Sequence, residues 1–370
     1  MRHVLITNDF YPKVGGIQAY LGEIYRRLDP TTFMVVTTQV PGAEAFDRDF
    51  PAPIVRLSRQ LLPTPKMRRA IGQSIQNFAP ELVVYDPIIP IGALGTSLGL
   101  PYALIAHGAE IRVPAHLPVL GAQLRRTVRR SLGVVAAGGY PADEVRKLSP
   151  STRVEIVPPG IDSRRFHPAE PLDRAQLRER WMRDPSRDLV LFVSRLVPRK
   201  GADTLLHAMA RAPMSSRSEV HLVGDGRDRS RLERIALSVA PPVIFHGRLS
   251  ETDKIELYQA ADLFVFPARD RWLGVEQEGF GIVILEAQAC GLPVIVGSSG
   301  GTAEALAPEG GLLLRRSDAR ELWWAIEEVR RDRARRDVTC KSASAYVREQ
   351  FDYDHQGRAY EAALQGLMHG

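Results

Sequence analysis

The chain has 370 residues, of which 44% are hydrophobic and 25% charged, and its formal net charge is +6. This composition excludes a disordered chain, and at about 150 residues per domain the length predicts roughly two to three domains. The sequence contains no apolar run long enough for a membrane-spanning helix, and the apolar stretch after Met1 is too short for a signal peptide. Two cysteines cannot supply a disulfide framework or a zinc cluster, so we expect a cytoplasmic protein.

The positive charge is concentrated in the first half of the chain. Residues 1–160 contain 18 Lys or Arg and 12 Asp or Glu, which accounts for the whole excess. The segments 50–80 and 111–142 contain no acidic residue but several arginines. Such segments favour nucleic acid, an anionic membrane or a phosphorylated substrate, although a solvated basic face is an equal alternative. Nucleic acid is disfavoured, because few aromatic residues interleave with the basic ones and no recognition motif is present.

Short apolar runs alternate with helical patterns along the first half. Continuous apolar strands separated by helices are typical of a parallel sheet that is covered on both faces. We expect helices that include 17–28, 66–78 and 117–132, and strands at 4–7, 33–38, 54–57, 82–85, 102–106, 134–137 and 154–157.

The alternation restarts after a proline-containing segment at 158–168, which is the predicted linker. The sequence therefore predicts an α/β fold with two doubly wound parallel sheets, whose ligands bind beyond the carboxyl ends of the strands in a cleft between the domains. One more helix, from about residue 351, could pack back on the first domain. The strands expected in the second half are 189–193, 219–223, 243–245, 263–266, 294–296 and 312–314.

The first motif, NDFYPKVGGIQ at 8–18, follows the first predicted strand and opens the first helix. Its adjacent Gly15 and Gly16 let a bulky group approach the backbone, and amides at a helix N-terminus suit an anion. The motif is neither GxGxxG nor a Walker loop, so a simple tight turn is the alternative.

The second motif places His107 directly after the strand 102–106 and before Gly108. Ligands bind at that end of the strands in a doubly wound sheet, so His107 is a candidate site residue. A histidine that caps a strand end is an equal alternative.

Two further motifs lie in the second half. Arg195 and Lys200 flank a turn that enters a helix, where two cations can clamp a diphosphate, unless both are merely solvated. Glu278 and Glu286 are eight residues apart, a little over two helical turns, and both can face one side if the helix starts early. Their carboxylates could accept hydrogen bonds from sugar hydroxyls, and the flanking Gly-Phe-Gly and Gly-Leu-Pro strengthen this interpretation.

Together, the four motifs resemble those of retaining glycosyltransferases of family 4, which have the GT-B fold of two Rossmann-like domains. The resemblance spans essentially the whole chain, with Arg-x4-Lys at Arg195 and Lys200 and Glu-x7-Glu at Glu278 and Glu286. Within the family, the segments 8–18, 107–110 and 278–283 are most similar to the phosphatidylinositol mannoside mannosyltransferases of actinobacteria.

The resemblance implies roles for individual residues. His107, Arg195, Lys200 and Glu278 are the expected catalytic residues, of which Arg195 and Lys200 neutralise the leaving diphosphate. Glu278 is expected to contact the hydroxyls of the transferred sugar, and His107 to lie beside the reaction centre. The other residues that the resemblance assigns to the donor are Gly15 and Gly16 at its phosphates, Glu286 at its ribose, and Gly224, Asp225, Phe280, Gly281, Ile282 and Val283 in the nucleotide pocket.

The resemblance also implies a division of labour between the domains. Residues 1–164 with the helix 351–370 would form the acceptor-binding domain, and residues 165–350 the donor-binding domain, with hinge residues near 158–168. The candidates for acceptor binding are Asp9, Lys13, Gln18, Lys66 and Arg68.

The physical mechanism follows from these roles. Arg195, Lys200 and the amides of Gly15 and Gly16 would stabilise the charge of the departing diphosphate, so that neither a metal nor a cofactor is required. The Asp-x-Asp triplets at 47–49 and 352–354 lie away from the four motifs and are poor candidates for a metal site. Retention would result from attack on the same face, with the departing phosphate as base.

The expected partners are GDP-mannose as donor and an anionic lipid acceptor at an anionic membrane surface, which places the protein on the inner face of the plasma membrane. The segment 66–69 and the helix 117–132 are the candidates for surface contact. In that helix Leu117, Leu120, Leu124 and Val128 recur at helical spacing among arginines, as in an interfacial helix. A helix packed on the core, with a basic outer face, fits equally well.

Two alternatives remain open. One is a family-4 transferase with a UDP-sugar donor and a soluble or polyprenyl-linked acceptor. The other is an epimerase or a sugar-nucleotide-binding protein of the same fold. A dehydrogenase is disfavoured, because Arg229 stands where GxGxxG, starting at Gly224, needs its third glycine.

Overall fold

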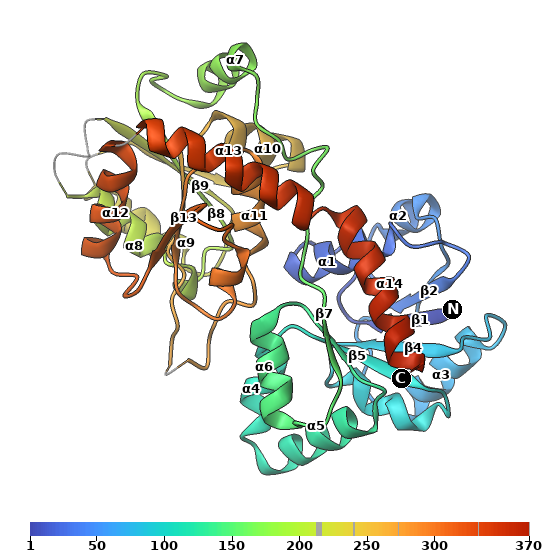
Figure 1. The fold of residues 1–370 in the computed structure, drawn as a ribbon. Helices are drawn as coiled ribbons and strands as arrows, with labels where there is room; N and C mark the ends of the chain where they lie inside the picture. Colours follow the sequence, from blue (N-terminus) through green and yellow to red (C-terminus); the bar gives the residue numbers. More distant parts are fainter. Residues whose placement is uncertain (212–216, 240, 273, 332, 370) are drawn as a thin grey trace. The chain divides into compact units, whose positions relative to one another are not determined.

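The computed structural model describes residues 1–369 except 212–216, 240, 273 and 332, and the side chains of 333–336 are also outside the description. The chain divides into two compact units, and each is described by itself (Figure 1). Unit 1 contains residues 1–160 and 353–370, and unit 2 contains residues 161–352. The boundaries predicted from the sequence differ from these by a few residues.

Unit 1 is built on a seven-stranded sheet in the order β3-β2-β1-β4-β5-β6-β7, in which every pair of neighbours is parallel. The strands are apolar along their whole length because helices cover both faces of the sheet. They are β1 (His3–Thr7), β2 (Phe33–Thr37), β3 (Ile54–Arg56), β4 (Leu82–Asp86), β5 (Tyr102–Ala106), β6 (Val134–Ala136) and β7 (Val154–Ile156).

Alternating residues of these strands enter two separate cores. The helical elements of unit 1 are α1 (Gly16–Tyr25), α2 (Ala43–Asp49), α3 (Pro65–Ile75), η1 (Ile91–Ser97), α4 (Ala109–Ala115), α5 (Pro118–Arg130), α6 (Gly139–Leu148) and α14 (Tyr353–His369). Val4 and Ile6 point into the core beneath α3, η1, α4, α5 and α6, whereas Leu5 points into the core beneath α1 and α14.

The helix α14 returns to unit 1 after the chain has completed unit 2, and it lies beside α1 (Figure 1). Its buried side chains Tyr360, Leu364 and Leu367 belong to the core beneath α1. The hydroxyls of Tyr25 and Tyr360 are 2.9 Å apart and hydrogen-bonded, which satisfies two polar groups inside this core.

Unit 2 is built on a six-stranded parallel sheet in the order β10-β9-β8-β11-β12-β13. The two parallel sheets predicted from the sequence are thus confirmed. Its strands are β8 (Asp188–Val193), β9 (Ser218–Val223), β10 (Val243–Gly247), β11 (Leu263–Phe266), β12 (Val294–Gly297) and β13 (Gly311–Leu314).

Helices of unit 2 follow most of these strands and cover both faces of the sheet. They are α7 (Pro171–Trp181), η2 (Pro198–Lys200), α8 (Ala202–Met209), α9 (Arg229–Ala236), α10 (Glu251–Ala260), α11 (Ile282–Ala289), η4 (Thr302–Ala305), α12 (Ala319–Arg331) and α13 (Arg333–Gln350). Across the described residues of both units, no helix combines the length and the apolar character needed to span a bilayer.

Candidate active site

The carboxyl ends of β1, β4 and β5 bring three polar side chains of unit 1 together. His107 follows β5, and its Nε2 lies 2.6 Å from Oδ1 of Asp86, the last residue of β4. The hydroxyl of Thr7, at the end of β1, donates to Oδ2 of Asp86 at 2.6 Å. Both Thr7 and Asp86 are fully buried, so His107 is joined to a carboxylate that solvent does not reach.

The surroundings of His107 favour its charged form. Burial alone would lower the pKa of its imidazole, but the neighbouring Asp86, together with Glu110 and Asp9, outweighs burial and raises it. The backbone N–H of His107 donates to Oε1 of Glu110 at 2.6 Å, and the ring of Tyr20 packs edge-on at a centroid distance of 5.8 Å. The surroundings of His107 therefore favour a protonated imidazole at the carboxyl edge of the sheet.

The loop after β1 is ordered by its own polar side chains. Nε2 of Gln18 donates to Oδ1 of Asp9 at 2.7 Å, and Nζ of Lys13 donates to the carbonyl of Asn8 at 2.7 Å. The side chain of Gln18 also covers Gly15, where an added Cβ would lie 2.3 Å from its Oε1. Burial, with Asp86 nearby, raises the pKa of Asp9. Asp9, Lys13 and Gln18 therefore form one cluster at the start of α1.

Gly16 is exposed as the first residue of α1, where backbone amides are free of helical partners. Lys66 and Arg68 are exposed on α3. The side-chain amide of Asn8 links the loop after β1 to the segment before α3, because it accepts from the backbone N–H of Leu61 and donates to its carbonyl.

In unit 2, the loops after β8 and β9 are joined through their backbones. The N–H of Leu196 donates to the carbonyl of Asp225 at 3.0 Å. Gly224 has φ 123°, and there is no room for a side chain, because an added Cβ would lie 2.0 Å from the carbonyl oxygen of Ser194. Arg195 is exposed in the first loop, and its guanidinium has no hydrogen bond or ion pair with any other described residue. Gly224, Asp225 and Arg195 are thus brought together.

Lys200 and Glu278 form a buried ion pair, with Nζ 2.6 Å from Oε2. The guanidinium of Arg199 donates to the same carboxylate oxygen. The pKa of Lys200 is lowered to about 8, because burial and the positive charges of Arg199 and Arg195 together outweigh the opposing effect of Glu278. The pKa of Glu278 lies below its usual value, because Lys200 and Arg199 outweigh the effect of burial.

Glu286 is held by a different pair of groups. Its Oε1 accepts from Nζ of Lys254 at 2.7 Å, and its Oε2 accepts from the hydroxyl of Tyr258 at 2.8 Å. Glu286 lies within α11, but that helix begins only at Ile282, so Glu278 belongs to the preceding loop. The condition that would place both carboxylates on one helical face is not met, and Glu278 takes its position from the loop instead.

The residues between the two glutamates lie at the start of α11. Gly281 has φ 91° and caps the helix, and Ile282 and Val283 are partly exposed in its first turn. The ring of Phe280 is buried in the core of unit 2 and packs against Phe351 at a centroid distance of 6.1 Å. A role for Phe280 at the donor would therefore use its backbone.

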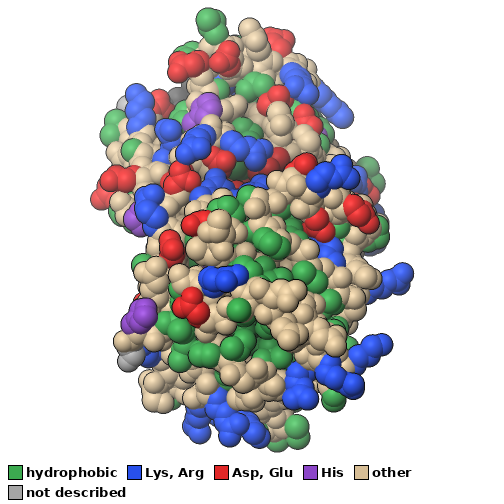
Figure 2. Space-filling model, turned by 90° about the vertical axis from the view of Figure 1, so that its right-hand side faces the viewer, with side chains coloured by type: hydrophobic (Ala, Val, Ile, Leu, Met, Phe, Trp, Pro, Cys, Tyr) green, Lys and Arg blue, Asp and Glu red, His purple; other side chains and the backbone are tan. Residues whose placement is uncertain are grey.

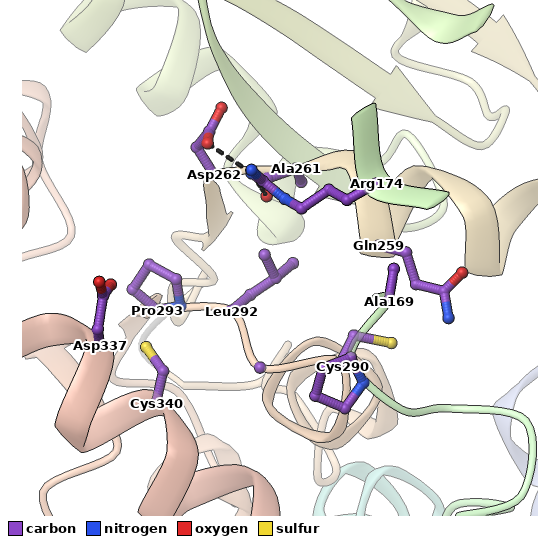
Figure 3. Close-up of a pocket in the computed structure, with 12 residues that line it drawn as sticks. Ala169, Arg174, Gln259, Ala261, Asp262, Cys290, Leu292, Pro293, Asp337 and Cys340 are labelled. Carbon is purple, nitrogen blue, oxygen red and sulfur yellow. Dashed lines mark hydrogen bonds and ion pairs between the residues drawn. The ribbon is translucent and has the colours of Figure 1, made fainter. Parts of the chain in front are cut away.

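The two described pockets lie elsewhere in unit 2. A pocket of about 300 Å³ is lined by both cysteines and by Arg174, which makes an ion pair of 2.6 Å with Asp262 (Figure 3). A larger pocket, of about 530 Å³, includes Trp324 and Cys340. Neither pocket includes a predicted site residue. Pocket size alone would direct attention away from the loops that carry the charged groups.

Three of the four carboxylates in the two Asp-x-Asp triplets have partners of their own. Asp47 binds the guanidinium of Arg56 through both oxygens at 2.7 Å, and Asp352 accepts from the backbone N–H of Ser163. Asp354 accepts from Nε of Arg27. Within the described part of the chain, no three His, Cys, Asp or Glu side chains are grouped as metal ligands.

Four residues of these clusters were missed from the sequence. Asp86 could have been found from its position, since it ends an apolar strand just as His107 follows the next one. Arg199 precedes Lys200 in the same motif. Lys254 and Tyr258 of α10 carry no local signal, because only the fold brings them to Glu286.

Comparison with known proteins adds a second line of observation. The family model for glycosyl transferases group 1 matches residues 173–346, and the model for glycosyltransferase family 4 matches residues 14–165. The chain is 33% identical, over 98% of its length and 97% of the relative, to the GDP-mannose-dependent monoacylated alpha-(1-6)-phosphatidylinositol monomannoside mannosyltransferase of Corynebacterium glutamicum. The chain belongs to glycosyltransferase family 4.

A second relative of this family-4 glycosyltransferase comes from Mycobacterium tuberculosis. It is a GDP-mannose-dependent alpha-(1-6)-phosphatidylinositol monomannoside mannosyltransferase, 34% identical over 95% of both chains. Solved structures agree on the GT-B fold. The HepE protein of Anabaena, determined with UDP, covers 99% of the chain and all of its own at 20% identity and a TM-score of 0.82. Sucrose-phosphate synthase of Thermosynechococcus elongatus covers 100% and 99% at 21% identity, with a TM-score of 0.83.

Proposed function

We propose that this family-4 glycosyltransferase transfers mannose from GDP-mannose to a phosphatidylinositol mannoside, with retention of configuration and an α linkage. The observation that carries the proposal is the identity of 33–34% over almost the whole chain to two enzymes that are named for this donor and this type of acceptor. The charged loops of unit 2 support it, because they supply groups that a sugar diphosphate requires.

The proposed donor site has a charge balance suited to a diphosphate. Arg199 and Lys200 share one carboxylate, Glu278, and the exposed Arg195 lies close enough to lower the pKa of Lys200, which leaves an excess of positive charge. When the bond between sugar and diphosphate breaks, negative charge grows on the departing phosphate. Cations that are already fixed in place lower the energy of that state without further reorganisation. The amides of Gly15 and Gly16 would add hydrogen bonds to the phosphates.

We assign recognition of the sugar and nucleoside to the other residues of unit 2. Glu278 would accept hydrogen bonds from the mannose hydroxyls, and Glu286 from the ribose, since each carboxylate is already oriented by two donors. The loop at Gly224 and Asp225 and the backbone from Phe280 to Val283 would line the nucleoside.

Unit 1 would bind the acceptor and supply His107. Asp9, Lys13 and Gln18 form a polar cluster in the loop after β1, and Lys66 and Arg68 add positive charge on the neighbouring α3. The acceptor hydroxyl would attack the face that the diphosphate leaves, and the departing phosphate would take its proton. This path accounts for retention without a covalent intermediate.

We place membrane contact at the elbow between α4 and α5. Of the two interpretations of the helix 117–132, burial supports the core-packed one for Leu124 and Val128, which are fully buried. The exposed apolar side chains gather instead at the start of α5, where Val119 is 80% exposed. Arg112 of α4 and the arginines of α5 belong to the same two helices, as suits an anionic lipid surface, and Figure 2 shows Lys and Arg side chains along the bottom of the view. The apolar residues of this elbow are Val113, Leu117, Val119 and Leu120.

Thermal stabilisation by nucleotides tests the donor assignment. A ligand that binds only the folded protein raises its apparent stability in proportion to saturation. GDP should raise the Tm more than UDP or ADP, and transfer from GDP-mannose to phosphatidylinositol monomannoside should follow in a detergent assay. A larger shift with UDP would refute the donor but not the enzyme class. No shift with any of the three would refute donor binding by these loops.

A further inference from the structure

His107 owes its orientation to a carboxylate on a different strand. We propose that Asp86 is a positioning residue, which accepts the Nε2–H of His107 and fixes the ring, so that Nδ1 is left for the substrate. The proposal rests on the proposed function to the extent that His107 is taken to act in the transfer. It adds a residue outside the four sequence motifs.

Burial separates Asp86 from any direct role. The residue is 0% exposed, and its two oxygens are occupied by His107 and by the hydroxyl of Thr7, each at 2.6 Å. A substrate cannot reach a carboxylate enclosed in this way, so any effect on the reaction must pass through His107. A buried carboxylate is also costly unless it is paired, which favours a charged partner.

The strand pairing explains how the two groups meet. β4 and β5 are parallel neighbours with Tyr85 opposite Leu104, so both strands end at the same edge of the sheet. Asp86 ends β4, and His107 follows β5 directly. The contact is therefore built into the register of the sheet and does not depend on a mobile loop.

Other elements around His107 reinforce its charge. Glu110 of α4 accepts from its backbone N–H, Asp9 of the loop after β1 adds a second carboxylate nearby, and Tyr20 of α1 packs on the ring. Lys13, the basic residue in the loop that holds Asp9, donates a hydrogen bond to the carbonyl of Asn8. Asp86 is the carboxylate among these that is hydrogen-bonded to the ring itself.

Nitrogen NMR of the imidazole tests the proposal without turnover. In the wild-type protein labelled with ¹⁵N-histidine, His107, assigned from its loss in His107→Ala, should keep the Nε2 proton and titrate above an ordinary histidine. In Asp86→Asn its pKa should fall, because a charge and a charge-assisted hydrogen bond are lost. An unprotonated Nε2 in the wild type overturns the proposal even if the variant does not fold. An unchanged titration in a folded Asp86→Asn overturns it as well.

A double-mutant cycle tests the consequence for transfer. Asp86→Asn should lower kcat on the order of 100-fold, the effect of misplacing a reacting group, with little change in the KM for GDP-mannose. In the His107→Ala background the same substitution should cost nothing further, because Asp86 acts through the histidine. An equal loss in both backgrounds would mean that Asp86 is only structural. The control is Asp143→Asn, which removes an exposed carboxylate of unit 1 and should leave kcat unchanged.

These experiments separate the two proposals. If the wild-type protein transfers no mannose, the proposed function fails, and the NMR titration still decides whether Asp86 governs His107. If mannose is transferred but the titration is the same in both proteins, the proposed function stands and the positioning role fails.

Discussion

At the scale of single residues, the arrangement around Glu278 determines when Lys200 is charged. Arg199 and Lys200 share the carboxylate of Glu278, and burial together with the charges of Arg199 and Arg195 brings the pKa of Lys200 down to about 8. In the free enzyme, Lys200 is therefore positive below that pH and neutral above it. If these cations bind the diphosphate as proposed, the loss of charge on Lys200 limits the pH range in which the free enzyme binds it.

Removal of Arg199 should raise the pH at which Lys200 loses its charge. For the wild type, kcat/KM for GDP-mannose should fall as the pH rises through about 8, because Lys200 loses its charge. In Arg199→Gln a positive neighbour is gone, the pKa of Lys200 rises, and the fall should occur at higher pH, with a lower kcat/KM on the plateau. Measurement of kcat/KM from pH 6 to 10 in both proteins checks the shift.

The matched control is Arg180→Gln, which removes an exposed arginine from α7. It should leave both the plateau and the position of the alkaline limb unchanged. A limb at the same pH in Arg199→Gln and in the wild type would show that Arg199 does not act on Lys200.

The residues that sequence alone could identify are those whose signal is local. His107, Lys200 and Glu278 each stand inside a short motif, so their types and spacing mark them. Asp86 stands 21 residues before His107, and the pair exists only because two strands are in register. Lys254 is even further from Glu286, at 32 residues, on another helix. A motif reveals the residue that faces a ligand, but not the partner that orients it.

At the scale of elements, the chain's apolar runs predicted every strand of both sheets to within about two residues at either end. Strands that are buried on both faces must be apolar along their whole length, so they stand out in the sequence. Helix faces were harder to predict. In α5, helical spacing alone could not tell whether Leu124 meets the core or a lipid surface, and the position of the sheet decides for the core. The start of α11 also depends on Gly281, whose left-handed backbone ends the loop.

The turn between η2 and α8 should be intolerant of any side chain at Gly201. Its φ is 77°, and an added Cβ would lie 2.0 Å from the carbonyl oxygen of Pro267, so backbone must move. Gly247, in the same unit, has a similar φ of 68°, but the contact there is 3.4 Å, to the end of the Arg229 side chain. In both alanine variants the left-handed backbone conformation costs about 1–2 kcal/mol of folding free energy. Gly201→Ala adds a steric clash beside Lys200.

We therefore expect Gly201→Ala to unfold at a clearly lower temperature than Gly247→Ala, and to lose donor affinity as well. Scanning calorimetry with and without GDP measures both effects. Equal Tm values for the two variants would contradict the close contact at Gly201.

The elbow of α4 and α5 should act as an element in lipid binding. The variant Val119→Asp with Leu120→Asp removes apolar groups and adds negative charge, so affinity for vesicles containing phosphatidylinositol should fall by about tenfold or more. Cosedimentation measures this affinity. Leu237→Asp is the control, because Leu237 is 89% exposed in unit 2, away from the elbow. This variant should bind vesicles like the wild type. Equal losses in both would point to a general effect of charge.

At the scale of the whole molecule, each unit contains a buried histidine that should make its stability depend on pH. Burial lowers the pKa of His3 to about 4 and that of His221 to about 3, whereas both titrate near 6.5 when unfolded. Below pH 6.5 the unfolded chain binds more protons than the folded one. The stability that comes from each neutral histidine is complete above that pH and is lost as the pH falls toward the folded value.

The free energy of unfolding should therefore decline below pH 6.5, by up to about 1.4 kcal/mol per pH unit for each histidine. His3→Leu should flatten the decline for unit 1 and His221→Leu for unit 2, as followed by urea unfolding from pH 7.5 to 4.5. His355→Gln, at an exposed position, should leave the slope as it is. A flat profile in the wild type would contradict neutral burial of both groups.

The return of α14 to unit 1 has a consequence for how the protein is made. Residues 1–160 leave the ribosome first, but Tyr360, Leu364 and Leu367 complete their core only after the roughly 190 residues of unit 2 have been translated. At about 5–20 residues per second, the nascent first unit waits on the order of 10–40 s with an apolar groove open beside α1. Unit 2 is contiguous and its synthesis takes up that time, so we expect the first half of the chain to reach its native state only when α14 packs beside α1 at the end of synthesis.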